Sequence, residues 1–253
     1  MLKNKNNKTL GVVILAAGHG TRMQSELPKV MHVLHGKSLV DHLVTAVEAS
    51  GIATRIVVVV NPNHDLVQEA LGERAEYAVQ QEQLGTGHAT QAAAAWLGDT
   101  VDDVIVLYGD MPFISAESIK ALYTEHLAKQ NTLTLMSVDL PNFEGTNVPF
   151  YGFGRIIRDA ENNIIKVVEM KDATEKELQM TEVNPSFFCF NAAWLWKQLA
   201  LLKNNNVQKE YYLTDLLHQA IDTGVSVSSV FVDADESRGV NSKEDLAIAH
   251  TLK

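Results

Sequence analysis

The sequence predicts an α/β fold, a Rossmann-like, doubly wound sheet whose strands are mostly parallel. Short β-rich runs alternate with amphipathic helical patterns from the start of the chain. Strand candidates such as 10–16 and 55–60 are almost continuously apolar, which is typical of strands covered by helices on both faces. After about residue 140 this rhythm changes, and turn residues and a hairpin pattern indicate an insertion or lid in the second half.

The elements of the first half follow from hydrophobic spacing. The strand candidates are 10–16, 55–60, 76–79, 103–108 and 132–138. Helical spacing joins Val40, Leu43, Val44 and Val47 on one face, and Ile119, Leu122, Tyr123 and Leu127 on another. Ser115 precedes the second of these helices, and we expect it to be the N-cap.

The second half begins with a loop rich in turn residues over 141–152. The later elements are expected to be a hairpin of 153–158 and 164–169, a strand at 183–190, helices near 192–202 and 211–222, a strand at 226–232 and a last helix at 242–252. We interpret this half as completing one site rather than as an independent domain.

Composition narrows the function classes. The chain has 253 residues, 46% of them hydrophobic and 21% charged, as in an ordinary globular protein. Its formal net charge of −10, with no dense basic cluster, argues against a nucleic-acid surface. The single cysteine, Cys189, excludes an internal disulfide, and its phenylalanine neighbours indicate an inert thiol in a buried strand.

No segment reaches the roughly 18 apolar residues that a membrane span requires. The polar, basic leader over residues 1–9 superficially resembles a signal peptide, but the apolar run after it has no convincing cleavage site. We therefore expect a cytoplasmic protein with a flexible leader and no membrane partner.

The most informative segment is Leu-Ala-Ala-Gly-His-Gly-Thr-Arg-Met at residues 15–23, which follows the first predicted strand. Small residues and two glycines allow backbone N–H groups to approach an anion closely. Arg22 and Lys29 add positive charge beside this loop, so the segment predicts a polyphosphate site. It is neither a Walker loop, which ends in Gly-Lys-Ser/Thr, nor a complete Gly-x-Gly-x-x-Gly fingerprint.

Tyr108-Gly109-Asp110 ends the fourth predicted strand with a carboxylate. Asp110 suits Mg²⁺, which takes oxygen ligands and is often held by one or two side chains together with substrate phosphates. The alternative is a simple turn in which Asp110 accepts backbone hydrogen bonds. Spacing alone leaves these two interpretations equally open.

The segment from Gln80 to Ala89 follows another strand and opens an alanine-rich helix. Gly85 or Thr86 at the helix N-terminus could recognise a base or ribose. Taken alone, the segment favours a structural interpretation in which the glycines shape the turn and Thr86 caps the helix. His88 has no second histidine or cysteine at ligand spacing and is interpreted as structural.

Several polar residues lie beside apolar runs. Individually each is weak evidence for a functional role, because such residues are more often surface or cap residues. They are Glu169, Asn184, Tyr212, Thr214 and Asn241. The segment 239–241 could supply the N-cap of the last helix.

Together these segments resemble the sugar-phosphate nucleotidyltransferases, and within them the bacterial N-acetylglucosamine-1-phosphate uridylyltransferases, usually the N-terminal half of a bifunctional enzyme. The matching segments run in order along nearly the whole chain: 15–23, 27–30 (Leu-Pro-Lys-Val), 82–89, 108–112, 154–156 (Gly-Arg-Ile), 168–173, 204–215 and 239–241. Segment 15–23 is typical of the superfamily. Segment 27–30 and Glu-Tyr-Tyr-Leu-Thr-Asp at 210–215 indicate this branch.

The resemblance implies a nucleotide-diphospho-sugar transferase fold and a role for each matching residue. It places Leu15, Ala16, Ala17 and Gly18 at the nucleotide, Arg22 and Lys29 at its phosphates, Gln80, Gly85 and Thr86 at the uracil, and Tyr108 and Gly109 at the nucleotide sugar. It places Gly154, Glu169, Asn184, Tyr212 and Thr214 at N-acetylglucosamine, and Asp110 and Asn241 at Mg²⁺. The implied catalytic residues are Arg22, Lys29 and Asp110.

The implied reaction is Mg²⁺-dependent transfer of UMP from UTP to N-acetylglucosamine 1-phosphate, releasing pyrophosphate. The implied organisation is a single domain over 10–253 with a nucleotide-binding half at 10–140, a sugar-binding half at 141–241 and a C-terminal helix at 242–253. We expect no acetyltransferase β-helix, and therefore no family trimerisation domain, within this chain.

Three departures from the family pattern bear on sugar specificity. His19 stands where the family usually has lysine, Pro185-Ser186 replaces Thr-Gly, and the loop 141–152 is longer than usual. Two rival functions remain: a nucleotidyltransferase for another nucleotide or sugar, such as a thymidylyl- or guanylyltransferase, and a non-catalytic sensor of nucleotide sugars. Retention of Arg22, Lys29, Asp110 and Asn241 argues against the sensor.

Overall fold

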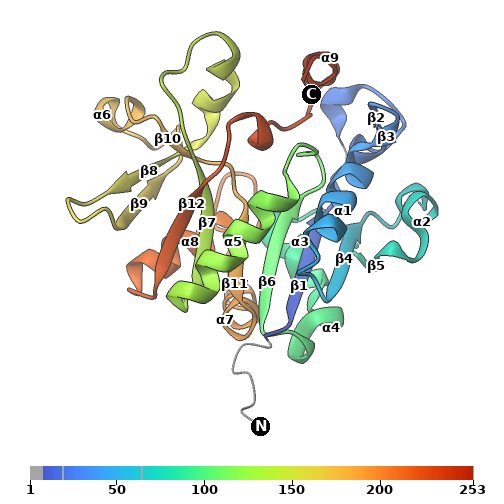
Figure 1. Ribbon diagram of the computed structural model, residues 1–253, viewed down its shortest axis with the longest axis horizontal. Coiled ribbons are helices and arrows are strands. Elements are labelled where there is room, and N and C mark those ends of the chain that lie inside the picture. The colour runs from blue at the N-terminus through green and yellow to red at the C-terminus, as the bar shows by residue number, and fades with distance from the viewer. Residues whose placement is uncertain (1–7, 19, 64, 253) are drawn as a thin grey trace.

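The computed structural model describes residues 8–18, 20–63 and 65–252, and Figure 1 shows helices packed on both sides of one large sheet. The strands are β1 (Leu10–Leu15), β2 (Val33–Leu34), β3 (Lys37–Ser38), β4 (Arg55–Val60), β5 (Glu76–Val79), β6 (Asp103–Tyr108), β7 (Leu133–Asp139), β8 (Gly154–Arg158), β9 (Ile164–Val168), β10 (Glu182–Asn184), β11 (Phe188–Asn191) and β12 (Val227–Phe231). The α-helices are α1 (Leu39–Ser50), α2 (Leu66–Leu71), α3 (Thr86–Ala92), α4 (Ala94–Leu97), α5 (Ala116–Lys129), α6 (Glu175–Leu178), α7 (Ala192–Leu199), α8 (Thr214–Asp222) and α9 (Lys243–Ala249). The predicted α/β class is confirmed.

The sheet has the order β5-β4-β1-β6-β11-β7-β10-β8-β9, with β12 beside β7. Strands β5, β4, β1 and β6 are mutually parallel, as predicted, and β12 is parallel to β7. The sheet as a whole is mixed, because β11 is antiparallel to both β6 and β7 and β10 is antiparallel to β7 and β8.

Alternate residues of the central strands belong to two different hydrophobic cores. Val12 and Ile14 belong to the core that contains Leu43 of α1, whereas Val13 belongs to the core that contains Leu195 of α7. Successive strand side chains point to opposite faces, so both faces of β1 are covered. This double burial explains the unbroken apolar runs and confirms the doubly wound interpretation.

The predicted single strand at 183–190 is wrong. The segment forms β10 and β11, which lie on opposite sides of β7 and pair on their other edges with β8 and β6, and Pro185 and Ser186 separate them. Ser186 has a positive φ of 68°, and Pro185 has no N–H for a sheet ladder. The hairpin of β8 and β9 forms as predicted, with an irregularity between Ile157 and Arg158.

Helix ends follow their caps. The Ser115 side chain accepts the Ser118 N–H at 3.1 Å, which confirms the predicted N-cap of α5. The cap predicted within 239–241 is wrong, because Ser242 caps α9 in a capping box with Asp245. Segment 145–152, inside the predicted loop, forms 3₁₀ turns.

Residues 1–7 of the predicted leader lie outside the described residues. Thr9 accepts the Asp102 N–H at 2.9 Å, and Lys8 Nζ lies 3.1 Å from the buried carboxylate of Asp103. No helix of the described chain has the length and apolar character needed to cross a bilayer.

Candidate functional site

The loop after β1 brings one end of the parallel sheet against Lys29. Gly20 has φ of 61°, and a Cβ built on it would lie 2.6 Å from the Cβ of Lys29. A glycine is therefore required on two grounds, conformation and space. Met23, fully buried just after Arg22, anchors the segment in the protein. His19 lies outside the described residues.

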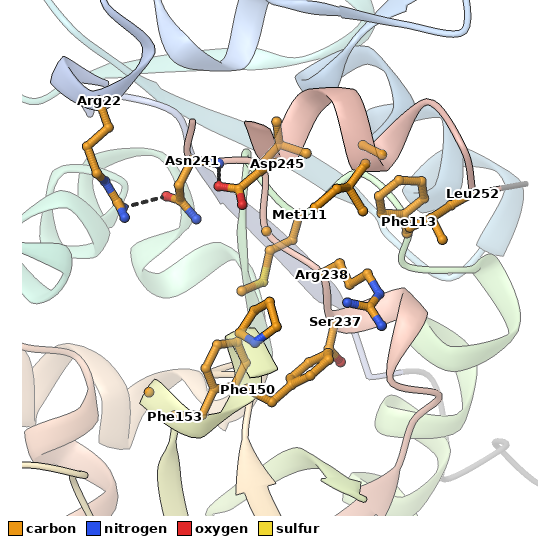
Figure 2. Close-up of a pocket in the computed structure, with 16 residues that line it drawn as sticks. Arg22, Met111, Phe113, Phe150, Phe153, Ser237, Arg238, Asn241, Asp245 and Leu252 are labelled. Carbon is orange, nitrogen blue, oxygen red and sulfur yellow. Dashed lines mark hydrogen bonds between the residues drawn. The ribbon is translucent and has the colours of Figure 1, made fainter. Parts of the chain in front are cut away.

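Lys29 bonds to two side-chain oxygens, those of Asp110 and Asn241, which lie far apart in the sequence. Its Nζ donates to the carboxylate of Asp110 and, at 3.0 Å, to Oδ1 of Asn241. Arg22 Nη2 donates to the same Oδ1 at 3.0 Å, as Figure 2 shows. Asp110 does lie in a turn, in which the Met111 N–H donates to the Tyr108 carbonyl at 3.0 Å. Its carboxylate, however, accepts from Lys29 and from no backbone N–H of the described residues. Arg22, Lys29, Asp110 and Asn241 therefore form one cluster.

The backbone explains why Asp110 and Asn241 meet. Val240 N–H donates to the carbonyl of Asp110 at 2.8 Å, which ties the end of β6 to the segment before α9. Asn241 N–H in turn donates to Oδ2 of Asp245 at 2.9 Å. The α9 capping box thus holds Asn241 next to the strand end.

The cluster fits a small divalent cation in its donor chemistry. The Lys29 ammonium is a cation bonded to both Asp110 and Asn241 oxygens, so one positive group can already bridge the two. Carboxylate and amide oxygens are ligands that Mg²⁺ accepts, with substrate phosphates completing its shell. Among the described residues, no group of three or more His, Cys, Asp or Glu converges as a preformed metal site.

A cavity of about 340 Å³ opens beside this cluster, between the carboxyl ends of β1 and β6 and the start of α3. It brings together nine predicted residues: Leu15, Ala17, Gly18, Lys29, Gln80, Gly85, Thr86, Tyr108 and Asp110. Ligands of open α/β sheets bind at such strand ends. Two further polar residues line the cavity, Gln83 and Glu210. Both lie within segments that carry the family resemblance, but no chemical pattern in the sequence singled them out.

The wall at Gly85 is fixed by a distant loop. Gly87 N–H donates to the Tyr211 carbonyl at 2.7 Å, and Tyr211 N–H donates to the Leu84 carbonyl at 2.7 Å. The Thr86 hydroxyl accepts the Leu213 N–H at 2.9 Å and makes no cap bond to its own helix, so its predicted capping role is wrong. A Cβ on Gly85, whose φ is 103°, would lie 2.6 Å from the Tyr211 oxygen.

Two predicted residues pack behind the cavity. Ala16 is buried, and Gly109 N–H donates to the Leu15 carbonyl at 2.9 Å. A Cβ on Gly109 would lie 3.0 Å from both that oxygen and Val30, so a glycine allows the two strand ends to approach. Burial raises the pKa of the neighbouring Tyr108, which keeps its phenol neutral.

Three of the five predicted sugar residues lie on or next to the antiparallel unit of β8, β9 and β10: Gly154, Glu169 and Asn184. Gly154 is paired with Asn184 across β8 and β10, and a Cβ on Gly154 would lie 3.6 Å from Oε1 of Glu169. The Ser186 N–H donates to Oδ1 of Asn184 at 2.9 Å, so the Pro185-Ser186 turn orients this amide. None of these residues lines the 340 Å³ cavity.

Tyr212 and Thr214 flank the start of α8, and the Tyr212 hydroxyl donates to Oε1 of Gln208. Burial raises the pKa of the Glu169 carboxyl, and negative Asp172 and Asp215 add to the shift while His218 opposes it. Burial likewise raises the pKa of Asp215 against the opposing His218. This region therefore holds carboxyl groups that gain protons more readily than usual.

A second cavity, of about 310 Å³, lies against Asn241 and Arg22 and is drawn in Figure 2. Its walls are largely apolar, with Met111 and Phe113 after β6 and Phe150 and Phe153 at the end of the long loop. The loop 141–152 therefore shapes this cavity.

Comparison with known proteins gives the family. Residues 12–161 match the MobA-like NTP transferase domain. The chain is 42% identical over 238 residues to a bifunctional protein GlmU from Brevibacillus brevis and 43% identical over 236 residues to that from Carboxydothermus hydrogenoformans. These alignments cover 94% and 93% of this chain but only 50% and 51% of the relatives, so the chain spans about half their length.

Among solved structures, a Bacillus anthracis protein assigned as a glucose-1-phosphate thymidylyltransferase, in complex with sucrose, has the same fold. Its TM-score is 0.75 at 17% identity, and the match covers 96% of this chain and 94% of that one. This likeness supports the fold of a nucleotide-sugar transferase.

Proposed function

The chain belongs to the MobA-like NTP transferase family of nucleotidyltransferases, and from this premise we propose that it transfers UMP from UTP to N-acetylglucosamine 1-phosphate. The products are UDP-N-acetylglucosamine and pyrophosphate. The relatives named GlmU support this choice over 93–95% of the chain. The observation that carries the proposal is the cluster of Arg22, Lys29, Asp110 and Asn241, two of which, Lys29 and Asp110, line the 340 Å³ cavity.

In this reaction a phosphate oxygen of the sugar 1-phosphate attacks the α-phosphorus of UTP, and the bond to pyrophosphate breaks. The attacking oxygen is already anionic near neutral pH, so no general base is needed. The difficulty is to hold two anions together and to stabilise the charge of the transition state. Lys29 and Arg22 supply fixed positive charge there, and the backbone of the loop after β1 supplies N–H donors.

Asp110 and Asn241 would hold Mg²⁺, which supplies charge neutralisation at the phosphates when bound. In the described arrangement Lys29 bonds to both of these oxygens. We propose that Lys29 exchanges these oxygens for a phosphate when substrates bind. The capping box of α9 keeps Asn241 in place during that exchange.

For the sugar we propose Gly154, Glu169 and Asn184 on the antiparallel unit, with Tyr212 and Thr214 at the start of α8. The Glu169 carboxylate and the Asn184 amide suit hydroxyl and acetamido groups, because both accept hydrogen bonds. The cytoplasmic location expected from the sequence remains a prediction.

The decisive experiment measures Mg²⁺-dependent pyrophosphate release from UTP with N-acetylglucosamine 1-phosphate. Glucose 1-phosphate and glucosamine 1-phosphate replace the acceptor in parallel, and thymidine, guanosine and adenosine triphosphates replace UTP. We expect the highest kcat/KM with UTP and the N-acetylated acceptor. A higher value for another pair would replace this function by that related transferase, and tight binding without turnover would favour a sensor.

A further inference from the structure

We propose that Arg155 is a positioning residue for the sugar, because it fixes the backbone at Gly154 from the opposite face of the sheet. The inference rests on the proposed function, and it concerns the wall that carries the proposed sugar residues. Arg155 is the second residue of β8, and its side chain is fully buried. In the part of the chain that the structure describes, no carboxylate forms an ion pair with it.

The Arg155 guanidinium is bound by one short segment of chain. Its Nη1 donates to the Phe153 carbonyl, and its Nη2 donates to the Tyr151 carbonyl at 3.0 Å. Its Cζ lies 4.5 Å from the ring centre of Phe143 and 5.1 Å from that of Tyr151. Its Nε is buried and bonds to no other described residue. A buried cation is costly unless other groups replace its water, so segment 143–153 supplies the contacts that compensate Arg155.

Segment 143–153 and the buried Arg155 therefore depend on each other. The segment is irregular, with 3₁₀ turns over Gly145–Gly152. If it moved away from β8, the cation would lose both carbonyl acceptors and both ring faces at once. A planar guanidinium can donate along its edge while it stacks on its faces, whereas a lysine ammonium has no such plane. Arg155 thus anchors this segment.

The Phe153 carbonyl connects the anchor to the sugar residues. It shares one planar peptide unit with the Gly154 N–H, so a bond that holds the carbonyl also sets the direction of the N–H. Glycine has the greatest backbone freedom of any residue, so the chain at Gly154 gains most from such a contact. The Phe153 N–H donates to the Phe150 carbonyl at 3.0 Å, which holds the same turn from its other side.

Strand register places Arg155 behind the sugar residues. It is paired with Val168 of β9 and with Val183 of β10. The residues that follow these two in the chain are Glu169 and Asn184. Because successive side chains of a strand point to opposite faces, Arg155 lies behind the wall and the proposed sugar residues lie in front of it.

The nucleotide cavity is separate from this support. No residue of segment 143–153 lines the 340 Å³ cavity. Loosening of the segment should therefore move the sugar residues and leave the nucleotide site unchanged, which separates a positioning role from a general loss of structure.

The test measures kcat and the KM values for UTP and N-acetylglucosamine 1-phosphate in the wild type, Arg155→Lys, Phe143→Leu, the double variant and Arg158→Lys. Arg158 is the matched control, because it also lies on β8 and its guanidinium bonds to Glu182 at 2.6 and 2.8 Å. It makes no hydrogen bond to segment 143–153 in the described chain. Amide hydrogen exchange of segment 143–153 measures directly whether each substitution loosens it.

We expect Arg155→Lys to raise KM for the sugar 1-phosphate about three- to tenfold, the scale of one hydrogen bond, with kcat and KM for UTP unchanged. Phe143→Leu removes one ring face and should raise the same constant by less. The double variant should fall short of the product of the two effects, because both substitutions act on one contact. Exchange in segment 143–153 should be faster in these three variants and unchanged in Arg158→Lys.

Faster exchange in a folded Arg155→Lys protein without a rise in KM for the sugar 1-phosphate would overturn the inference, and so would unchanged values of both. An equal rise in both KM values, or the same selective rise in Arg158→Lys, would also overturn it. Failure of the proposed function appears already in the wild type, as no pyrophosphate release from this substrate pair, and the inference would fall with it. Failure of the inference alone appears only in the variants.

Discussion

The parallel edge of β5, β4, β1 and β6 and the antiparallel unit of β8, β9 and β10 present their polar residues in different ways. At the parallel edge, candidate residues follow the carboxyl ends of separate strands and line one cavity. In the antiparallel unit, Gly154 and Asn184 meet through strand pairing, and Glu169 follows the end of β9.

The electrostatics of the two regions differ as well. At the parallel edge a carboxylate, Asp110, is bonded to a cation, Lys29. Next to the antiparallel unit, burial raises the pKa of Glu169, which follows β9, and of Asp215 on α8. A cation therefore lies against the carboxylate of the first region, whereas the Glu169 carboxyl beside the second region gains a proton more readily than an exposed carboxyl does.

The largest effect is expected from removing a charged side chain at the parallel edge. Lys29→Ala should lower kcat about 10²–10³-fold, because it removes a preorganised cation that acts on the transition state. Asp110→Ala should do the same. Pyrophosphate release measures the loss, and Lys37→Ala, at an exposed lysine, is the control. A folded Lys29→Ala enzyme with near-wild-type kcat would remove this residue from the mechanism.

The next largest effect is expected where the cavity wall at Gly85 packs against the 211–213 loop. Gly85→Ala should lower the free energy of unfolding by about 1–3 kcal/mol and raise KM for UTP, because the Cβ would meet the Tyr211 oxygen at 2.6 Å. Gly36→Ala is a matched control, since Gly36 also has a positive φ, of 85°, but has no atom within 4 Å of the added Cβ.

Urea denaturation and substrate titration measure the two effects of these glycine variants. Equal destabilisation in both proteins, with unchanged KM, would show that only the backbone conformation matters at Gly85.

A smaller effect, confined to the KM for the sugar 1-phosphate, is expected from changing Glu169. Glu169→Gln is expected to raise KM for the sugar 1-phosphate about tenfold, the scale of one hydrogen bond to a charged group, while KM for UTP stays constant. Steady-state kinetics with each substrate varied in turn separates the two constants, and the exposed Glu175→Gln is the control. A parallel rise in both KM values would contradict the division between the two regions.

The smallest effect concerns pH. Because the pKa of Glu169 is raised in the folded protein, the folded state binds this proton more tightly than the unfolded chain. The resulting stabilisation is complete below the ordinary pKa of 4.5 and is lost as pH rises through the raised pKa. Glu169→Gln should therefore stabilise the protein relative to wild type at pH 8, and this gain should vanish near pH 4. A constant difference across that range would contradict the assignment.

The same two regions differ in how far the sequence predicted them. Apolar runs predicted the bounds of the parallel-edge strands to within about one residue, because these strands are buried on both faces and bounded by turns. Their candidate residues converge because parallel strands end at one edge. The antiparallel unit depends on long-range pairing, so the split at Pro185 and Ser186 and the place of β11 between β6 and β7 were not predictable from local patterns.

Two parts of the site also needed the structure. The bond from Val240 N–H to the Asp110 carbonyl, which brings Asn241 to the strand end, joins residues far apart in sequence. The place of Gln83 in the cavity, with its amide nitrogen buried and without a hydrogen-bond partner among the described residues, is also not recorded by any sequence pattern.

The proposed mechanism depends on one cation site that spans the end of β6 and the segment before α9. A crystal structure with UDP-N-acetylglucosamine and Mn²⁺, in which the metal is located by its anomalous scattering, would show whether this site exists. We expect Mn²⁺ bound to oxygens of both Asp110 and Asn241, with the Lys29 ammonium on a phosphate. Mn²⁺ bound elsewhere, with Lys29 still joining those two side chains, would contradict it.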